Sequence, residues 1–196
     1  MTKFVLASGS PRRKELLEQM GICFEISPAH GDEIITKELP AEIVEELSCA
    51  KASEVAERYV QQSINDTTVI IGADTIVAHG AEIMGKPADQ DDAVRMLDLL
   101  QGDTHQVYTG VTLVILKDGT RSTMTFSKKT DVLMYPMTKE QIKAYVETGE
   151  PMDKAGAYAI QGKCAAYIKG IHGDYNNVVG LPVARLMQEL FALKLI

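Results

Sequence analysis

The chain has 196 residues, of which 45% are hydrophobic and 24% are charged, a composition typical of an ordinary globular protein built as one domain. Its formal net charge of −7 argues against binding to nucleic acid, because contact with a phosphate backbone requires a basic face. No apolar run reaches the ~18 residues of a membrane span. The first residues also lack the pattern of a signal peptide, so we expect a cytoplasmic protein without a membrane partner.

Residues 3–21 predict a strand, a short loop and a helix. Residues 3–7 are nearly all apolar and end at a Ser-Gly-Ser-Pro sequence, as expected of a short buried strand. A helix follows at once, because Ser10 suits the N-cap position and Pro11 suits the first helical position. Gly21 supplies the C-terminal stop of this helix.

The first turn of this helix carries an unusual charge. Arg12, Arg13 and Lys14 lie where the helix dipole is already positive and where acidic residues are normally favoured. An anion bound there would explain them, because free backbone N–H groups at a helix N-terminus bind phosphate and arginines add paired contacts. The segment therefore predicts a phosphate site that includes Ser8 and Ser10. An ordinary capped helix with solvated arginines is equally compatible with this stretch taken alone.

The next elements carry charged residues that are unremarkable one by one. Residues 23–27 predict a strand, and residues 28–33 predict a loop that ends in two adjacent carboxylates. Glu33 is one of them, and on local grounds a solvated turn is the favoured interpretation. Residues 40–61 predict a long amphipathic helix, on which Lys51 taken alone reads as a surface charge.

A β-branched apolar run at residues 67–73 predicts a central strand that is buried on both faces and ends at Asp74 and Thr75. Ligands of open α/β sheets bind beyond the carboxyl ends of strands, so Asp74 is a candidate site residue. The alternative is an aspartate that caps a turn. A short strand at residues 76–78 comes next, and Lys86 then lies between glycine and proline in a rigid loop.

The remaining elements continue the alternation of helices and strands. Neither a repeat nor a linker divides the chain, so residues 1–196 are expected to form a single domain. The predicted elements are a helix at 89–100, a hairpin of strands 104–116 and 120–134 around Asp118-Gly119, a capped helix at 138–147, a strand at 165–168, and a last helix that is opened by 170–182 and runs to about 195.

Four segments taken together resemble the Maf (septum formation protein) family of nucleoside triphosphate pyrophosphatases. They are LASGSPRR at 6–13, GADT at 72–75, GKP at 85–87, and DKAGAYAIQG at 153–162 followed by NVVGLP at 177–182. Each is weak alone, but their joint occurrence in this order over nearly the whole chain is specific. The resemblance implies an elongated α/β molecule with a mixed sheet, similar to the inosine-triphosphatase-like fold, with a deep cleft between two lobes.

The resemblance also implies a reaction. The family hydrolyses the bond between the α- and β-phosphates with the help of Mg²⁺ and releases pyrophosphate and a nucleoside monophosphate. Mn²⁺ is expected to substitute for Mg²⁺, because the site is lined by oxygen atoms that suit a hard cation. Asp74 matches the proton acceptor. Arg12, Thr75 and Gln161 match the residues that tune substrate choice in the branch that resembles dTTP/UTP pyrophosphatases. The Gln161 amide can donate to a carbonyl and accept from the N3–H group of uracil or thymine, although it could instead satisfy backbone groups in its own turn.

Elementary chemistry agrees with these implied roles. Lys51, Lys86 and Lys154 can neutralise charge on the leaving pyrophosphate, while the residues that would hold phosphates at the helix N-terminus are Ser8, Ser10, Arg12 and Arg13. Glu33 and Asp74 supply the hard oxygen ligands that Mg²⁺ prefers. One carboxylate cannot be both a tight metal ligand and a free base, so Asp74 is assigned to water activation and Glu33 to the metal as a preference.

Two other functions compete with hydrolysis. A nucleotide-binding regulator of cell division without turnover would need the cationic groups but not the carboxylate pair. A dinucleotide-dependent oxidoreductase is disfavoured, because no GxGxxG sequence follows the first strand. The expected partner is a nucleoside triphosphate, and the sequence leaves a homodimer open.

Overall fold

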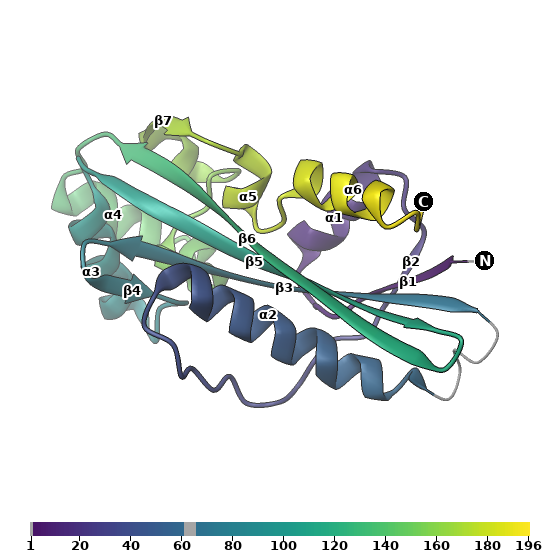
Figure 1. The fold of residues 1–196 in the computed structure, drawn as a ribbon. Helices are drawn as coiled ribbons and strands as arrows, with labels where there is room; N and C mark the ends of the chain where they lie inside the picture. Colours follow the sequence, from purple (N-terminus) through teal and green to yellow (C-terminus); the bar gives the residue numbers. More distant parts are fainter. Residues whose placement is uncertain (1, 61–65) are drawn as a thin grey trace. The chain divides into compact units, whose positions relative to one another are not determined.

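The computed structural model describes residues 2–60 and 66–196, which contain both strands and helices (Figure 1). In chain order they are β1 (Thr2–Leu6), α1 (Pro11–Gln19), β2 (Phe24–Ile26), α2 (Pro40–Glu57), β3 (Thr67–His79), β4 (Glu82–Met84), α3 (Gln90–Leu100), β5 (Thr104–Lys117), β6 (Thr120–Met134), α4 (Lys139–Val146), the 3-10 helices η2 (Glu150–Asp153), η3 (Ala155–Ala157) and η4 (Lys163–Tyr167), β7 (Ile168–His172), α5 (Tyr175–Val179) and α6 (Val183–Ala192).

The strands form one mixed sheet, which confirms the predicted α/β class. The order of its strands is β2-β1-β3-β5-β6-β7, and β4 pairs with β3 beside this path. β1 pairs in parallel with both β2 and β3, whereas β4 and β7 pair antiparallel with β3 and β6. A two-residue turn joins β5 to β6, and both of its residues, Asp118 and Gly119, have a positive φ, as in the hairpin turn that the sequence predicts.

The chain divides into two compact units, each with its own apolar core. Unit 1 contains Met1–Asp74, Thr109–Lys128 and Gly180–Ile196, and unit 2 contains Thr75–Tyr108 and Lys129–Val179. β3, β5 and β6 contribute residues to both units. The predicted single domain and the predicted cleft between lobes stay predictions.

In unit 1, α2 packs unusually close to the sheet because two glycines of the strands leave room for its backbone. A Cβ atom on Gly72 of β3 would lie 2.4 Å from the carbonyl oxygen of Ser48, and one on Gly110 of β5 would lie 2.2 Å from that of Val44. Such contacts are too short for any side chain, so only glycine allows this approach. Around it lies an apolar cluster formed by Val5, Ala7, Ala52, Val55, Ala56, Ile70, Val114 and Leu116.

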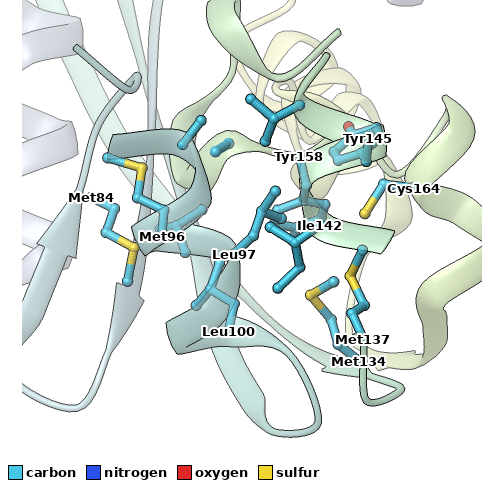
Figure 2. Packing of buried hydrophobic residues seen from close by; sticks show 14 of the residues in the cluster. Met84, Met96, Leu97, Leu100, Met134, Met137, Ile142, Tyr145, Tyr158 and Cys164 are labelled. Carbon is cyan, nitrogen blue, oxygen red and sulfur yellow. The ribbon is translucent and has the colours of Figure 1, made fainter. Parts of the chain in front are cut away.

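The core of unit 2 lies around α3 and α4, and it is rich in methionine (Figure 2). Flexible methionine side chains fill irregular gaps, which suits a region built from short helices and turns. The fully or nearly fully buried members of this core are Val77, Met84, Ala93, Met96, Leu97, Leu100, Val107, Val132, Met134, Met137, Ile142, Tyr145, Val146, Ala157, Tyr158 and Cys164.

The structure corrects the predicted end of the central strand. β3 does not stop at Asp74 but runs without a break to His79, so the separate strand predicted at residues 76–78 is part of it. Antiparallel pairing with β4 extends β3, with Val77 opposite Met84 and His79 opposite Glu82. The sequence pattern treats an aspartate as a strand breaker, whereas pairing with a neighbouring strand overrides that preference.

The other differences are local. Residues 163–167, which include most of the strand predicted at 165–168, form the 3-10 helix η4, and it buries Cys164 completely. A separate short helix, α5, precedes α6 instead of merging with it. Residue 61, the predicted end of the long helix, lies outside the described residues, within which α2 ends at Glu57. None of the helices in the described part of the chain has the length and apolar character to cross a membrane.

Candidate active site

The loop before α1 is organised around the side chain of Ser8. This buried hydroxyl accepts hydrogen bonds from the backbone N–H of Ser10 at 3.3 Å and from Nη1 of Arg13 at 3.1 Å. Ser10 occupies the N-cap position with extended backbone, as predicted, but its side chain makes no capping hydrogen bond. Ser8 therefore shapes the loop, while the hydroxyl of Ser10 is not used to cap its own helix.

The amino end of α1 differs from those of α3 and α4. Asp89 caps α3 by accepting from the backbone N–H of Asp92 at 2.8 Å, and acidic residues follow in the first turn. Thr138 and Gln141 form a reciprocal capping box on α4. α1 has no acidic residue in its first turn and carries arginines there instead. Its positive dipole end is thus reinforced rather than neutralised, as expected of an anion-binding site.

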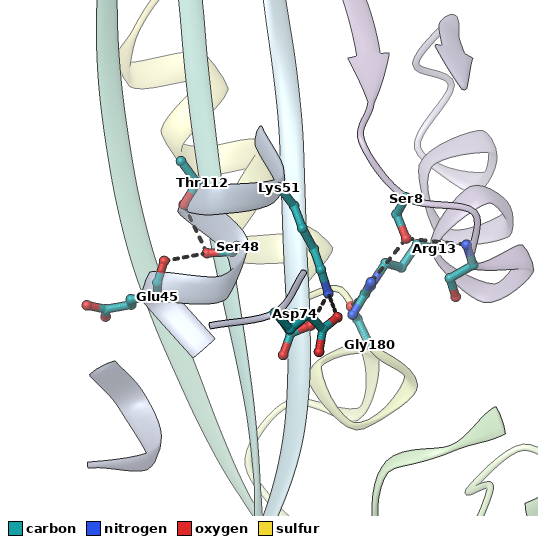
Figure 3. Close-up of polar contacts among 10 residues, drawn as sticks. Ser8, Arg13, Glu45, Ser48, Lys51, Asp74, Thr112 and Gly180 are labelled. Carbon is teal, nitrogen blue, oxygen red and sulfur yellow. Dashed lines mark hydrogen bonds and ion pairs between the residues drawn. The ribbon is translucent and has the colours of Figure 1, made fainter. Parts of the chain in front are cut away.

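Arg13 is held inside unit 1. Its Nε donates to the carbonyl oxygen of Gly180 at 2.9 Å, in addition to the bond from Nη1 to Ser8 (Figure 3). Burial lowers the pKa of Arg13 below its usual value, and the nearby carboxylate of Asp74 acts in the opposite direction. The guanidinium therefore fixes the loop and the chain at Gly180, and it places a cation near Asp74.

The centre of the candidate site is a chain of three charged groups. The ammonium group of Lys51 lies 2.5 Å from Oδ1 of Asp74, as Figure 3 shows. It also lies 2.7 Å from Oε1 of Glu33. The side chains of Asp74 and Lys51 are 11% and 22% exposed, whereas that of Glu33 is 56% exposed. Glu33 thus faces solvent and Asp74 the interior. These three groups alone carry a net negative charge, part of which the buried guanidinium of Arg13 offsets, because it interacts with both carboxylates.

Backbone geometry brings these groups together. Parallel pairing of β1 with β3 ends where Leu6 lies opposite Ile71, and the N–H of Ala7 donates to the carbonyl of Ile71 at 2.8 Å. The Ser8 loop starts just beyond this pair, so it and Asp74 lie at the same level of the sheet. The close approach of α2 at Gly72 then brings Lys51 over the strand. Asp74 lies inside β3, yet beyond the carboxyl end of its parallel neighbour.

The carboxylate pair suits a hard divalent cation but does not enclose one. Carboxylate oxygens are the ligands that Mg²⁺ prefers, and an ammonium group already sits between these two. Among residues 2–60 and 66–196, no set of three or more histidine, cysteine, aspartate or glutamate side chains is grouped as a metal site. A cation held here would take its remaining ligands from substrate and water.

In unit 2, a backbone hydrogen bond connects the GKP motif at 85–87 to the motif at 153–162. The backbone N–H of Gly156 donates to the carbonyl of Gly85 at 3.0 Å, so the loop that presents Lys86 is tied to the segment that carries Lys154. A Cβ atom on Gly156 would lie 2.7 Å from Val77 of β3, which shows how closely this segment packs on the strand. Thr75 lies in β3 itself.

The polar side chains of these motifs differ in how they are held. Lys154 donates to the carbonyl of Glu150 at 2.7 Å and to Oδ1 of Asp153 at 2.6 Å. Lys86 is exposed, and Gln161 is exposed in a tight turn. The structure thus gathers Lys86, Lys154 and Gln161 on connected segments of unit 2.

Sequence reasoning missed three residues that hold these groups. It assigned no role to the carbonyl of Gly180, which accepts from Arg13, or to Tyr145 and Glu150, which contact the turn around Gln161. Gly180 belongs to the recognised NVVGLP segment, so its motif was a usable signal. Tyr145 lies on the apolar face of α4, where the sequence pattern indicates only a core residue and gives no signal of a contact with the turn.

A surface hollow in unit 1 is not part of this site. It has a volume of about 460 Å³ and lies along the outer side of α2. The residues that line it are Lys37, Glu42, Glu45, Glu46, Cys49, Ala50 and Ser53. Three glutamates make it a poor place for a polyanion such as a triphosphate.

Comparison with known proteins gives a consistent result over nearly the whole chain. The family model described as Maf-like protein matches residues 3–193. A dTTP/UTP pyrophosphatase of Agathobacter rectalis is 56% identical over 198 residues, which cover 97% of both chains. Proteins of the same name from Lachnoclostridium phytofermentans and Bacillus cytotoxicus are 50% and 48% identical over 191 residues, which cover 97% of this chain and 94% and 95% of theirs.

A solved structure is also similar, but only distantly. It is a nucleoside-triphosphatase (dITP/XTP pyrophosphatase) from Mycobacterium abscessus, with a TM-score of 0.40 and 11% identity, and the match covers 68% of this chain and 74% of that one. A likeness at this level carries no argument about the fold or the site.

Proposed function

The chain belongs to the Maf family, and we propose on that premise that it hydrolyses nucleoside triphosphates, dTTP and UTP in preference, to a nucleoside monophosphate and pyrophosphate. Three relatives that are 48% to 56% identical bear the name dTTP/UTP pyrophosphatase. The observation in the chain itself that carries the proposal is the placement of Lys51 between Asp74 and Glu33. A protein that only binds phosphate has no use for two carboxylates at this position.

In the proposed mechanism, Asp74 accepts the proton of the attacking water. Its carboxylate is nearly buried and fixed by Lys51, so it has the defined position that a general base requires. Glu33, the exposed carboxylate, is free of that task and is assigned to the metal.

The cationic groups divide between the substrate and the leaving group. We assign the amino end of α1, with Ser8, Ser10 and Arg12, to the phosphates, and Arg13 to phosphate binding through the loop that it fixes. Lys51, Lys86 and Lys154 neutralise charge as pyrophosphate leaves. Residues of both units are assigned to one reaction on the strength of the sequence motifs.

A divalent cation completes the proposal. Glu33 would hold Mg²⁺ or Mn²⁺ together with phosphate oxygens, with the carboxylate of Asp74 close by, and the bound ion would supply positive charge to the triphosphate. The residues Arg12, Thr75 and Gln161 are assigned to the choice of substrate.

A panel of nucleoside triphosphates tests the function directly. The purified chain is incubated with Mg²⁺ and with dTTP, UTP, dATP, GTP or 7-methyl-GTP, and pyrophosphate and monophosphate are quantified. We expect both products in equal amounts and the fastest release from dTTP and UTP. Binding of dTTP without release of pyrophosphate would support the alternative, a nucleotide-binding regulator, and would overturn the proposal.

A further inference from the structure

The turn that presents Gln161 is held from outside by two side chains. The backbone N–H of Gly162 donates to the carbonyl of Ala159 at 3.3 Å, which closes a four-residue turn with Gln161 in its third position. The glutamine side chain is exposed, so the backbone of this turn, rather than surrounding packing, sets where the side chain starts. Whatever fixes the turn therefore fixes the point from which the amide extends.

Tyr145 and Glu150 contact the turn on both sides of Gln161. The hydroxyl of Tyr145 accepts from the backbone N–H of Ala159 at 3.1 Å, and Oε2 of Glu150 accepts from that of Lys163 at 3.1 Å. The same hydroxyl donates to Oε1 of Glu150 at 2.9 Å. The two side chains thus form a continuous bridge from one end of the turn to the other.

The carboxylate of Glu150 also packs against the turn. A Cβ atom on Gly162 would lie 2.1 Å from Oε1 and 2.6 Å from Oε2, so the carboxylate fills the space that any side chain at 162 would need. The backbone carbonyl of Glu150 accepts from Lys154 as well. One residue therefore fixes the turn of Gln161 and the ammonium group of Lys154.

Tyr145 is suited to its part of the bridge. It projects from α4 into the core of unit 2, where it is 4% exposed (Figure 2). Burial raises the pKa of Tyr145 well above its usual value, and the nearby Cys164 acts in the same direction. The hydroxyl therefore stays protonated and donates a hydrogen bond to Glu150 throughout the usual range of pH.

We propose that Tyr145 and Glu150 are positioning residues for substrate selection, which act by holding the turn that presents Gln161. The inference rests on the proposed function, in which Gln161 reads the base. A base-reading amide discriminates better when the backbone that carries it is held in place, because a mobile turn lets the amide reach and pair with several bases. The bridge provides this restraint from within unit 2.

Tyr145→Phe is the central variant, because it removes the hydroxyl and keeps the buried ring. We expect the ratio of kcat/KM for dTTP to that for GTP to fall roughly fivefold, the size of a lost hydrogen bond, mainly through a higher KM for dTTP. Tyr158→Phe is the matched control. Its ring is equally buried in the same core, but its hydroxyl lies 2.8 Å from Nε2 of His105.

A double-mutant cycle separates positioning from general destabilisation. If Tyr145 acts through Gln161, Tyr145→Phe will leave the dTTP/GTP ratio unchanged in a Gln161→Ala background. Glu150→Gln keeps an oxygen that can accept from Lys163 and should retain more selectivity than Glu150→Ala. Thermal unfolding of every variant shows whether the fold is retained.

The possible outcomes separate a failure of the proposed function from a failure of the positioning role. If the unmodified chain releases no pyrophosphate from dTTP or UTP, the proposed function fails. If it does so but Tyr145→Phe keeps the selectivity of Tyr158→Phe, or if the effects of Tyr145→Phe and Gln161→Ala simply add, the positioning role is wrong and the function stands.

Discussion

Unit 1 and unit 2 hold their candidate residues in different ways. In unit 1, charged side chains contact one another, as Lys51 does with Asp74 and Glu33. In unit 2, backbone groups and a buried tyrosine hold the turns that present Lys154 and Gln161. Paired charged groups suit a site where negative charge develops on phosphate during the reaction. Turns of fixed backbone suit a site where hydrogen bonds distinguish one base from another. Changes at the charged groups around Lys51 in unit 1 should therefore affect turnover, and changes at the turn of Gln161 in unit 2 should affect selectivity.

Removal of the metal should have the largest effect. We expect EDTA to abolish pyrophosphate release from dTTP and added Mg²⁺ or Mn²⁺ to restore it, because the oxygen-lined pair in unit 1 suits a hard cation. Since the described residues offer no enclosed metal site, the cation should enter with the substrate. EDTA should then leave the thermal unfolding of the nucleotide-free chain unchanged. Undiminished turnover in EDTA would contradict a metal-assisted reaction and the assignment of Glu33 to the metal.

Asp74→Asn should be the most damaging single substitution. It keeps the size of the side chain but removes the proton acceptor, so we expect pyrophosphate release to fall ~10²-fold or more. The control is Asp131→Asn in unit 2, the same change at a carboxylate that pairs with Lys129 at 3.1 Å. Circular dichroism and thermal unfolding check that both variants fold. Near wild-type turnover by Asp74→Asn would rule out this residue as the base.

The candidate residues could be named from sequence motifs, but the contacts that hold those residues could not be. Asp74 was recognised through its motif, but its strand was ended too early, because pairing with β4 is not visible locally. Lys51 taken alone read as a surface charge, and only the fold brings it to Asp74, which is 23 residues away along the chain. Gly72 was noted only as part of a motif. Its function is steric, and that depends on where α2 packs.

The amino ends of α1 and α4 also show which contacts could be predicted from the sequence. Ser10 occupies the N-cap position that its residue type predicts, yet Ser8 is the serine whose hydroxyl bonds the backbone there. The cap predicted for the helix at 138–147 was confirmed as a capping box of Thr138 and Gln141, because every atom it needs is local. Local signals therefore predicted elements well, and contacts between distant segments could not be predicted from one sequence.

Unit 2 should carry a marked pH dependence of stability through His105. This histidine is completely buried, its Nε2 lies 2.8 Å from the hydroxyl of Tyr158, and its Nδ1 has no partner among the described residues. Burial lowers the pKa of His105 to about 4, and His79 acts in the same direction while Asp103 opposes it. Protonation would place an uncompensated charge inside the core.

The sign of the effect follows from the lowered pKa. Above pH 6.5 the histidine is neutral in both states and its contribution to stability is complete. Between pH 6.5 and 4 the unfolded chain binds the proton first, so the free energy of unfolding should fall by about 3 kcal/mol over that range. Denaturant titrations at several pH values give the free energy of unfolding of the wild type and of His105→Asn. The slope of this free energy against pH between 4 and 6.5 should be steeper for the wild type. Equal slopes for the two proteins would show that His105 does not titrate in this way.

Gln161→Ala should have the smallest effect on turnover and a specific effect on selectivity. Uracil and thymine present a carbonyl beside an N3–H group, and the glutamine amide can donate to the first and accept from the second. A base that cannot satisfy both groups loses at least one of these two hydrogen bonds, and the exposed amide of Gln161 then keeps its contact with water instead. We expect the variant to lose roughly tenfold in kcat/KM for dTTP, with little change for GTP, so that the ratio of kcat/KM between the two substrates falls.

Steady-state release of pyrophosphate from both nucleotides measures the effect of Gln161→Ala on this ratio. Lys163→Ala, a change at an exposed neighbouring side chain, is the control. Equal losses for dTTP and GTP would mean that Gln161 supports binding in general and that the base is read elsewhere.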